Sequence, residues 1–394
     1  MNRNKFIRKN KRICALVSCN LSMAPRLRKT AESLSNKGYD VSIIAWDRTG
    51  EEKKYIKTNN YKIINISIKQ RSTNILFMFL YFVYFLIKAL IYSIKLKFDI
   101  IHCYNFDVLP IGIINKKLRK KKLVYDAAEL YGEMLKTINV PKIIPYIVYL
   151  FEFRLARFSD LNITVNHLIK KYLLYKGVNN VVDTMNCPIM TGWEANANSV
   201  KEIRKNLNIE DKFVVGFYGT LTYYRGLEEL IKSAEIISKT NYDIQFLIIG
   251  RGLLKNKLQN IVKIKKLENI KFLDYVPYEI IPNYVSATDL QCILNSPKLE
   301  VCHIGNPNRF FESIYLGRPL LVSNFGTLKY LIDEIKCGMT VNPEDPNDIA
   351  EKIITLYKDP DARKKMGEFG VKAAKEIYNW ESQSIKFLQE YEKL

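Results

Sequence analysis

Short apolar runs alternate with longer amphipathic segments along this chain of 394 residues, and the alternation predicts an α/β protein. In the first half, runs of strand length lie at 13–18, 40–45, 62–67, 99–103, 122–125 and 160–165. A second series lies at 213–217, 244–249, 270–273, 290–294, 320–323 and 339–341. Helical segments separate most of these runs, which is the pattern of a doubly wound parallel sheet. We therefore expect two Rossmann-like domains, each built around its own parallel sheet.

A polar segment at 187–199 separates the two series of runs. It contains Pro188, Gly192 and several asparagines, which is typical of a linker. Ligands bind at the carboxyl ends of the strands in open parallel sheets. We therefore expect the two domains to face each other across a ligand-binding cleft.

The segment 306–319 carries the most informative polar pattern. Asn306 can cap a helix, Pro307 suits its first position, and a Gly-Arg-Pro triplet ends it. The start of a helix presents free N–H groups and the positive end of its dipole, which favours phosphate. Glu312, about one turn further on, can accept hydrogen bonds from vicinal hydroxyls. Phosphate plus diol suggests a nucleotide ribose, although the segment alone also fits an ordinary capped helix.

Read with four other blocks, this segment resembles the donor-binding motif of family 4 glycosyltransferases, in particular a bacterial and archaeal cell-surface saccharide branch. The blocks occur in the order of that family, at 26–39, 98–102, 124–131 and 217–227. The resemblance implies a GT-B fold with an acceptor-binding domain at 1–190 and a nucleotide-sugar-binding domain at 200–378. It also implies a final helix, within 379–394, that crosses back to the first domain.

The resemblance implies a hexosyltransferase that moves a sugar from a nucleotide sugar with retention of configuration and without a protein nucleophile. The residues expected to bind the donor are Gly219, Thr220, Arg225, Asn306, Asn308, Arg309, Phe310 and Glu312. Arg225 follows the first strand of the second domain, where a guanidinium can clamp a diphosphate with two hydrogen bonds. The family often has an arginine in place of Thr220, so we expect Arg309 to supply the second cation. The alternative for Arg309 is a solvated side chain in a first turn.

Fixed cations aimed at the leaving nucleoside diphosphate lower the barrier to transfer, because that group gains negative charge as the bond breaks. The catalytic candidates are Arg225, Glu312, Asp126 and Glu129, and the candidates on the acceptor side are Arg26, His102 and Asp107. The candidates of the first half also fit strand-end residues satisfied by backbone. No metal or cofactor is predicted, since the Asp-x-Asp letters at 359–361 precede a helix and suit a cap.

Two positions depart from the family pattern. Ala128 stands where the third block normally carries a histidine, and Ile304 stands where the first of two signature glutamates is expected. These departures motivate a second hypothesis, in which the chain is a catalytically impaired homologue that binds a nucleotide sugar or partners another transferase.

Excess positive charge is confined to the first half of the chain. Residues 1–190 hold 33 Lys+Arg against 13 Asp+Glu; subtraction from the totals of 61 and 40 leaves 28 against 27 for residues 191–394. A basic half indicates an anionic neighbour. Nucleic acid is disfavoured, because the densest aromatic cluster lies in a charge-free helix rather than among basic residues.

That aromatic cluster occupies 72–87, sixteen residues without a charge. It predicts a helix that lies in the membrane interface, is buried against the sheet, or spans the bilayer. The basic amino terminus, 3–12, is either a polybasic membrane contact or a solvated end, and its short apolar sequel does not fit a signal peptide. Seven scattered cysteines without a Cys-x-x-Cys pair suit a reducing compartment. We therefore expect a cytoplasmic protein, peripheral on the inner face of the cell membrane, with a lipid-linked or saccharide acceptor.

Overall fold

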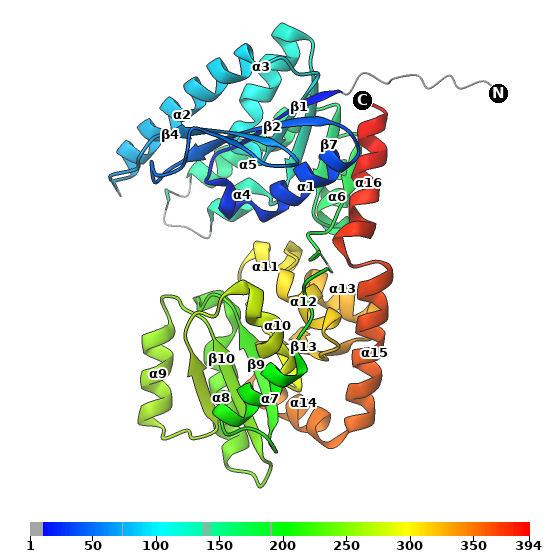
Figure 1. Ribbon diagram of the computed structural model, residues 1–394. Helices are drawn as coiled ribbons and strands as arrows, with labels where there is room; N and C mark the ends of the chain where they lie inside the picture. The colour runs from blue at the N-terminus through cyan, green and yellow to red at the C-terminus, as the bar shows by residue number, and fades with distance from the viewer. Residues whose placement is uncertain (1–10, 73, 137–139, 142, 190) are drawn as a thin grey trace, which may run out of the picture. The chain divides into compact units, whose positions relative to one another are not determined.

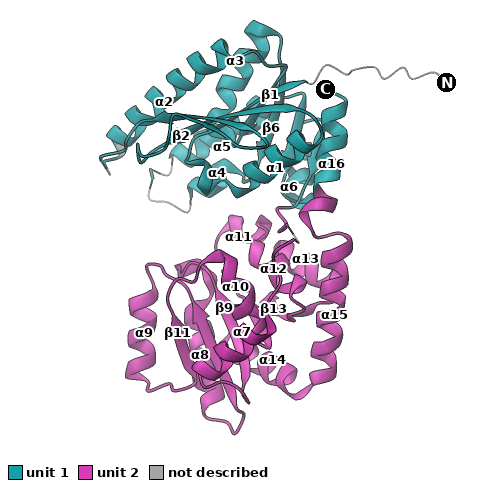
Figure 2. Cartoon of the chain, in the orientation of Figure 1, with its two compact units in different colours: residues 1–185, 384–394 teal, residues 186–383 magenta. Residues whose placement is uncertain are grey.

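The computed structural model describes residues 11–72, 74–136, 140–141, 143–189 and 191–394. The chain forms two compact units, shown in Figure 2. Unit 1 comprises residues 1–185 together with 384–394, and unit 2 comprises residues 186–383. Most of the basic amino-terminal segment, 1–10, lies outside the described residues, so its membrane role stays a prediction.

Unit 1 is built around an eight-stranded sheet in the order β3-β4-β2-β1-β5-β6-β7-β8 (Figure 1). The strands are β1 (Arg12–Val17), β2 (Asp40–Asp47), β3 (Tyr55–Lys57), β4 (Lys62–Ser67), β5 (Ile100–Tyr104), β6 (Lys122–Ala127), β7 (Leu161–Thr164) and β8 (Val181–Asp183). All neighbours are parallel except β3 and β4. The edge strands β3 and β8 were not predicted, because three half-polar residues carry too little alternation to stand out.

The helices of unit 1 connect these strands. They are η1 (Leu21–Met23), α1 (Pro25–Asn36), α2 (Ile75–Lys95), η2 (Phe106–Val108), α3 (Leu109–Arg119), α4 (Tyr131–Leu135), α5 (Ile143–Ala156) and α6 (His167–Tyr175). Most of the aromatic cluster of the sequence lies in α2, and the helix continues with the apolar pattern past Lys88 to Lys95. The side chain of Asn74 caps this helix by accepting a hydrogen bond from the N–H of Leu76 at 2.9 Å.

Unit 2 is built around a six-stranded parallel sheet in the order β11-β10-β9-β12-β13-β14. The strands are β9 (Phe213–Tyr218), β10 (Ile244–Ile249), β11 (Ile270–Leu273), β12 (Leu290–Ile293), β13 (Leu320–Ser323) and β14 (Gly338–Val341). Each coincides with a predicted run to within one residue at either end. The prediction of two doubly wound, Rossmann-like domains is confirmed.

The helices of unit 2 connect its strands, and the last helices lead the chain back to unit 1. They are α7 (Ala197–Asn206), η3 (Tyr223–Arg225), α8 (Leu227–Ser238), α9 (Lys255–Ile264), η4 (Tyr278–Ile280), α10 (Ile281–Ser286), α11 (Glu300–Ile304), α12 (Asn308–Tyr315), α13 (Gly326–Ile335), α14 (Pro346–Lys358) and α15 (Pro360–Glu376). The last helix, α16 (Trp380–Glu392), begins in unit 2, and its residues from Ser384 onward belong to unit 1. Asp359 caps α15 through the N–H of Ala362 at 2.8 Å, as predicted for the Asp-x-Asp letters.

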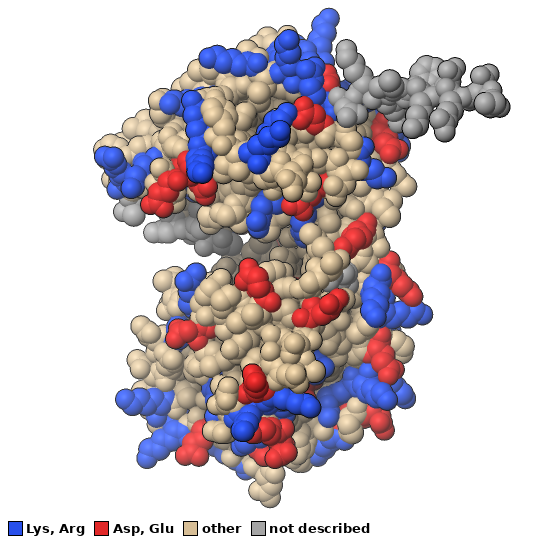
Figure 3. Space-filling view, viewed as in Figure 1, with Lys and Arg blue, Asp and Glu red and all other residues tan. Residues whose placement is uncertain are grey.

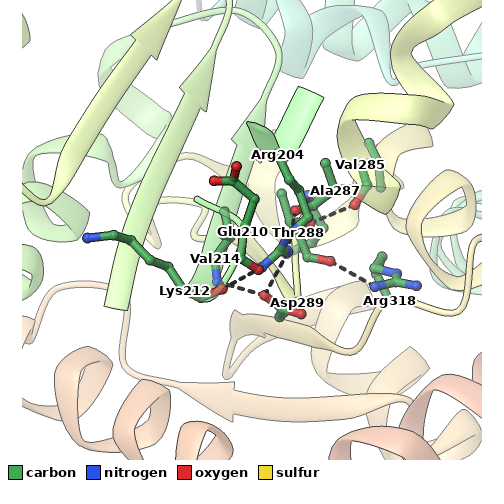
Figure 4. Close-up of polar contacts among 10 residues, drawn as sticks. Arg204, Glu210, Lys212, Val214, Val285, Ala287, Thr288, Asp289 and Arg318 are labelled. Carbon is green, nitrogen blue, oxygen red and sulfur yellow. Dashed lines mark hydrogen bonds and ion pairs between the residues drawn. The ribbon is translucent and has the colours of Figure 1, made fainter. Parts of the chain in front are cut away.

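A group of hydrogen bonds joins the amino ends of β9 and β12 to α7 (Figure 4). Asp289, directly before β12, accepts from the N–H of Val214 at 2.8 Å and from Nη1 of Arg204 at 3.3 Å. The same guanidinium donates to the carbonyls of Ala287 at 2.9 Å and Lys212 at 2.6 Å. One arginine therefore fixes three segments and leaves the opposite, carboxyl edge of the sheet open for loops that bind ligands.

Candidate functional site

The loops that leave β9 and β10 pack tightly at the carboxyl edge of the second sheet. The N–H of Gly219 donates to the carbonyl of Ile249 at 3.0 Å, and a Cβ on Gly250 would lie 1.9 Å from the carbonyl oxygen of Gly219. Both glycines have positive φ, 134° and 146°. Gly219 has open space where a side chain would stand, and Thr220 beside it is exposed. The backbone here can therefore approach a ligand closely.

Helix α12 begins beside these loops, one residue later than predicted. Pro307 is its N-cap with extended backbone, and no side chain forms a capping hydrogen bond, so the assignment of Asn306 as cap is wrong. The fixed φ of proline, here −69°, fits a cap as well as a first helical position. Among the described residues the N–H groups of Asn308 and Arg309 have no acceptor, which leaves the expected anion seat available.

Arg309 is buried rather than solvated, with 8% of its surface exposed. Its guanidinium lies 4.5 Å from the centre of the Phe217 ring, and Nη1 donates to the carbonyl of Tyr218 at 3.3 Å. Nε and Nη2 are buried and have no hydrogen-bond partner among the described residues. Burial and the nearby Arg225 lower the pKa of Arg309 to about 9. A buried cation with two free donors is costly unless an anion completes it.

Arg225 supplies a second cation next to this one. It ends η3, where Nη1 donates weakly to Oδ1 of Asn295 at 3.4 Å and the guanidinium lies over the ring of Tyr224 at 5.2 Å. Neither Arg225 nor Arg309 forms an ion pair with a described residue. Two unpaired guanidinium groups beside an open helix start form a site for an anion with more than one negative charge.

Glu312 is buried on α12, with 3% of its surface exposed. Its Oε2 accepts from the hydroxyl of Tyr218, and its Oε1 accepts from the hydroxyl of Tyr278, both at 2.8 Å. Burial, followed by the Glu312 charge, raises the pKa of both tyrosines. The two hydroxyls fix the orientation of the carboxylate. Neither tyrosine was among the predicted site residues. Tyr218 lies within the sequence block 217–227, whereas no sequence pattern pointed to Tyr278.

The remaining predicted donor residues have different surroundings. Phe310 is fully buried and packs on Phe311 with ring centres 5.5 Å apart, so its side chain belongs to the core. Asn308 is exposed, and its Oδ1 accepts from the side-chain amide of Asn186 at 3.1 Å. Asn306 is half-buried in the loop before α12. Only the backbone of Phe310, whose N–H donates to Pro307 at 2.9 Å, helps to shape the helix start.

Three predicted residues of unit 1 form one buried network. Asp126 is fully buried and pairs with Arg26, through Nε at 3.2 Å and Nη2 at 3.1 Å. Arg26, 2% exposed, also donates to the carbonyl of Thr184 at 2.7 Å. His102 lies 3.7 Å from Asp126, and its Nδ1 contacts the hydroxyl of Tyr391 on α16 at 2.5 Å. Burial lowers the pKa of His102 to about 4, so the ring is neutral near pH 7. These side chains bind one another rather than solvent.

Asp107 and Glu129 lie at the carboxyl edge of the first sheet, Asp107 buried and Glu129 exposed. Asp107 follows β5; its Oδ2 accepts from the hydroxyl of Ser18, and its Oδ1 has no partner among the described residues. Burial raises the pKa of Asp107 from 3.8 to about 6. Glu129 follows β6 and reaches solvent, yet the surrounding protein raises its pKa by desolvation. Both carboxyls hold their protons more strongly than usual, which suits contact with acceptor hydroxyls.

The raised pKa of Asp107 predicts a pH-dependent stability. The folded chain binds this proton more tightly than the unfolded chain, so the contribution is complete below pH 3.8 and is lost as the pH rises through about 6. We expect Asp107→Asn, which keeps an acceptor for Ser18, to be more stable than wild type at pH 8 by about 2 kcal/mol and to lose this advantage near pH 4. Urea unfolding at a series of pH values measures the difference. A gap that does not vary with pH would contradict the assignment.

A groove of about 720 Å³ lies elsewhere in unit 2, between α15 and the segment before β13. Its lining includes Asp289, Arg318, Arg363 and Lys372. Asp289 and Arg318 precede strands β12 and β13, so the groove lies at the amino ends of the strands, away from Arg225 and Arg309. We therefore assign the functional site to the carboxyl edge of the sheet, because of the cations Arg225 and Arg309, and not to this groove.

Comparison with known proteins finds a similarity that includes this edge. Residues 199–373 match the family model described as "Glycosyl transferases group 1". The matched segment lies within unit 2. The residues gathered at its carboxyl edge, from Gly219 to Glu312, all lie within the matched range.

The curated relatives of this chain are distant. Spore coat protein SA of Bacillus subtilis is 24% identical over 201 residues, which cover 49% of this chain and 52% of that protein. The chain spans about half the length of the first curated relatives that it matches. The capsular polysaccharide biosynthesis glycosyltransferase CapM of Staphylococcus aureus is 25% identical, over 98% of this chain and 99% of CapM.

Solved structures show the same fold over nearly the whole chain. Sucrose-phosphate synthase from Thermosynechococcus elongatus superposes with a TM-score of 0.78 over 98% of this chain and 99% of that one, at 16% identity. Anabaena HepE, solved in complex with UDP, has a TM-score of 0.76 over 98% and 100%, at 15% identity. The GT-B fold predicted from the sequence is confirmed. At this identity the likeness concerns the fold.

Proposed function

We propose that the protein is a hexosyltransferase that moves a sugar, with retention, from a nucleotide-sugar donor to a lipid-linked or cell-envelope saccharide. The observation that carries this proposal is Arg309, a buried guanidinium with two unpaired nitrogens beside an uncapped helix start. The match to the group 1 family model and the UDP held by the HepE structure support a nucleoside diphosphate as the missing anion. CapM, which matches over nearly the full chain, supports an acceptor of the cell envelope.

In this mechanism the diphosphate lies against the start of α12 and between the guanidinium groups of Arg225 and Arg309. Both cations are held before the donor binds, so they stabilise the charge that develops on the leaving group without reorganisation. Glu312, oriented by the hydroxyls of Tyr218 and Tyr278, accepts hydrogen bonds from the ribose. The acceptor hydroxyl attacks the same face of the sugar that the diphosphate leaves, with no protein nucleophile and no metal.

The acceptor belongs, in this proposal, to unit 1. Glu129 is exposed, and its raised pKa suits the binding of sugar hydroxyls at the carboxyl edge of the first sheet; Asp107 is buried at the same edge. Asp126, Arg26 and His102 lie beneath them and hold this edge in place. The basic first half would keep the protein on the cytoplasmic face of the cell membrane, where a lipid-linked acceptor is found.

A panel of nucleotide sugars tests the proposal directly. The matching donor at about 100 times its dissociation constant should stabilise the protein by roughly 2.7 kcal/mol in a thermal-shift assay. Glu312→Ala should reduce donor affinity by about tenfold, since it removes the acceptor of the ribose hydrogen bonds. A panel without any shift, from nucleotide sugars or free nucleoside diphosphates, would refute a nucleotide-sugar role.

The alternative, a catalytically impaired homologue, rests on Ala128 and Ile304. Both side chains are half-buried. The names of the full-length and partial relatives do not favour it, since CapM and others are called glycosyltransferases. Measuring donor hydrolysis or transfer for wild type and Glu312→Ala separates the two hypotheses. If wild type binds the donor without turning it over, and the turnover of the variant is no different, the impaired homologue is favoured.

A further inference from the structure

Two helices of unit 1 expose apolar side chains to an unusual extent. Residues 76–80 of α2 are all exposed, from 39% for Met78 to 62% for Leu76. On α5 the exposed set includes Tyr146 at 58%, Ile147 at 45% and Phe151 at 48%. We call residues 76–80 and 143–151 together the α2–α5 surface. Monomeric soluble proteins rarely leave such sets of large apolar side chains in water.

The fold brings the two parts of this surface to one side. Helix α2 follows β4 and precedes β5, and α5 follows β6 and precedes β7, all parallel strands of one sheet. Both helices therefore begin at the carboxyl edge of the sheet, where the acceptor is expected. Helix α3 packs against both α2 and α5 and joins them into one layer.

The charge around the α2–α5 surface is positive. The segment 69–98 contains five Lys or Arg and no Asp or Glu. Of these, Lys69 and Arg71 directly precede α2, next to its exposed first turns. The one acid at the end of the surface, Glu152, is fully buried and accepts from the hydroxyl of Tyr125 at 2.8 Å. Figure 3 shows basic side chains over the region of α2 and α3.

We infer that the α2–α5 surface docks unit 1 onto an anionic lipid bilayer, with the first turns of both helices in the interface. This inference deepens the proposed function by naming the surface through which the protein meets the membrane of its acceptor. Large aromatic and aliphatic side chains with lysines and arginines around them match a bilayer of acidic lipids, which offers hydrocarbon beneath negative headgroups.

The structure also decides how α2 meets the bilayer. Its residues 76–95 are long and apolar enough to cross a membrane, with a mean hydropathy of 2.0. However, Phe85, Ala89 and Ser93, spaced one turn apart, are fully buried, and Phe85 stacks on Trp46 at 5.2 Å. Ser93 accepts from Asn115 at 3.0 Å inside the unit. One face of the second half of α2 is thus packed on the unit, while Ile87, Ile91 and Ile94 remain 46–52% exposed. A helix that is held against the sheet along one face lies on a bilayer rather than across it, so α2 is an interfacial helix and not a span.

Vesicle binding by the full chain tests this inference. Wild type should bind vesicles of phosphatidylcholine with phosphatidylglycerol, and much less those of phosphatidylcholine alone, with weaker binding at high salt. Phe79→Glu and Ile147→Glu should each weaken binding by about tenfold, since each places a charge in the apolar interface. Leu253→Glu and Ile264→Glu, at apolar positions of unit 2 that are still more exposed, are the controls and should bind as wild type.

The depth to which position 79 enters the bilayer can be measured separately with the variant Phe79→Trp. Its fluorescence should shift to shorter wavelength on vesicles and be quenched by lipids brominated near the headgroup more than at the chain ends. Equal binding by Phe79→Glu and wild type would overturn the inference, as would self-association of the chain through this surface without vesicle binding. Donor-induced thermal shifts, measured without lipid, keep the test independent of the proposed function. A normal shift with no vesicle binding would remove the docking surface alone.

Discussion

Replacement of Arg309 by methionine should reduce sugar transfer at least a hundredfold, about 3 kcal/mol, while leaving the empty protein as stable as wild type or more stable. The loss of transfer follows because Nε and Nη2 have no partner until an anion binds. The gain or neutrality in stability follows because burial without a counter-charge opposes folding, as the lowered pKa indicates. Methionine keeps the length of the side chain and its packing on Phe217. Thermal unfolding with and without a nucleoside diphosphate, combined with transfer rates, measures both effects.

Arg318→Met is the matched control for this experiment. Arg318 is also desolvated, which lowers its pKa, but Nε donates to the carbonyl of Leu316 at 3.2 Å and Nη1 to that of Thr288 at 2.8 Å. Its removal should destabilise unit 2 and leave the nucleotide-induced shift intact. If Arg309→Met destabilised the empty protein as much as Arg318→Met and kept the shift, the arginine would be a structural residue and the donor site would lie elsewhere.

The parallel sheets could be predicted from the sequence because each buried strand is a continuous apolar run. The six strands of unit 2 were found to within one residue at either end for this reason. The same signal fails for β3 and β8, which are three residues long and half-buried at the edge of a sheet. The relative placement of polar residues on different strands is not encoded in any local pattern. The ends of strands β5 and β6 therefore marked candidate residues without showing which of them reach solvent.

For the donor site, the local pattern identified the helix and its charge but not its partners. Arg309 stood out because a cation in a first helical turn is unfavourable without an anion. That Arg309 is buried, and that Tyr278 reaches Glu312 from η4, 34 residues away, depends on tertiary packing. In unit 1 the sequence marked Asp126, Arg26 and His102 as separate candidates at strand ends and a helix start. Whether such residues contact substrate or one another could not be predicted, since both roles require the same residue types.

Removal of the Asp126 carboxylate should destabilise unit 1 by about 3–5 kcal/mol. Asp126→Ala removes the carboxylate that pairs with the buried guanidinium of Arg26, while the bond of Arg26 to the carbonyl of Thr184 stays. His102 cannot take over the role of acceptor for a cation, because its ring is neutral at pH 7 and already contacts Tyr391. Denaturant unfolding of the variant at pH 7, with activity measured on the folded fraction, gives the size of the effect. The exposed pair of Lys62 and Asp40, at 3.0 Å, provides the control, and Asp40→Ala should cost less than about 1 kcal/mol.

The double variant Arg26→Met with Asp126→Leu separates a structural role of this pair from a catalytic one. Replacing both charges by apolar side chains of similar size also removes the guanidinium of Arg26, which the single variant leaves without the Asp126 carboxylate. Most of the stability lost in Asp126→Ala should therefore return. If the pair only holds the edge of the sheet, transfer activity should return with stability. If Asp126 contacts the sugar or the acceptor, as its place in the third sequence block suggested, the double variant will be stable and inactive. The burial of both side chains, 0% and 2% exposed, leads us to expect the first result.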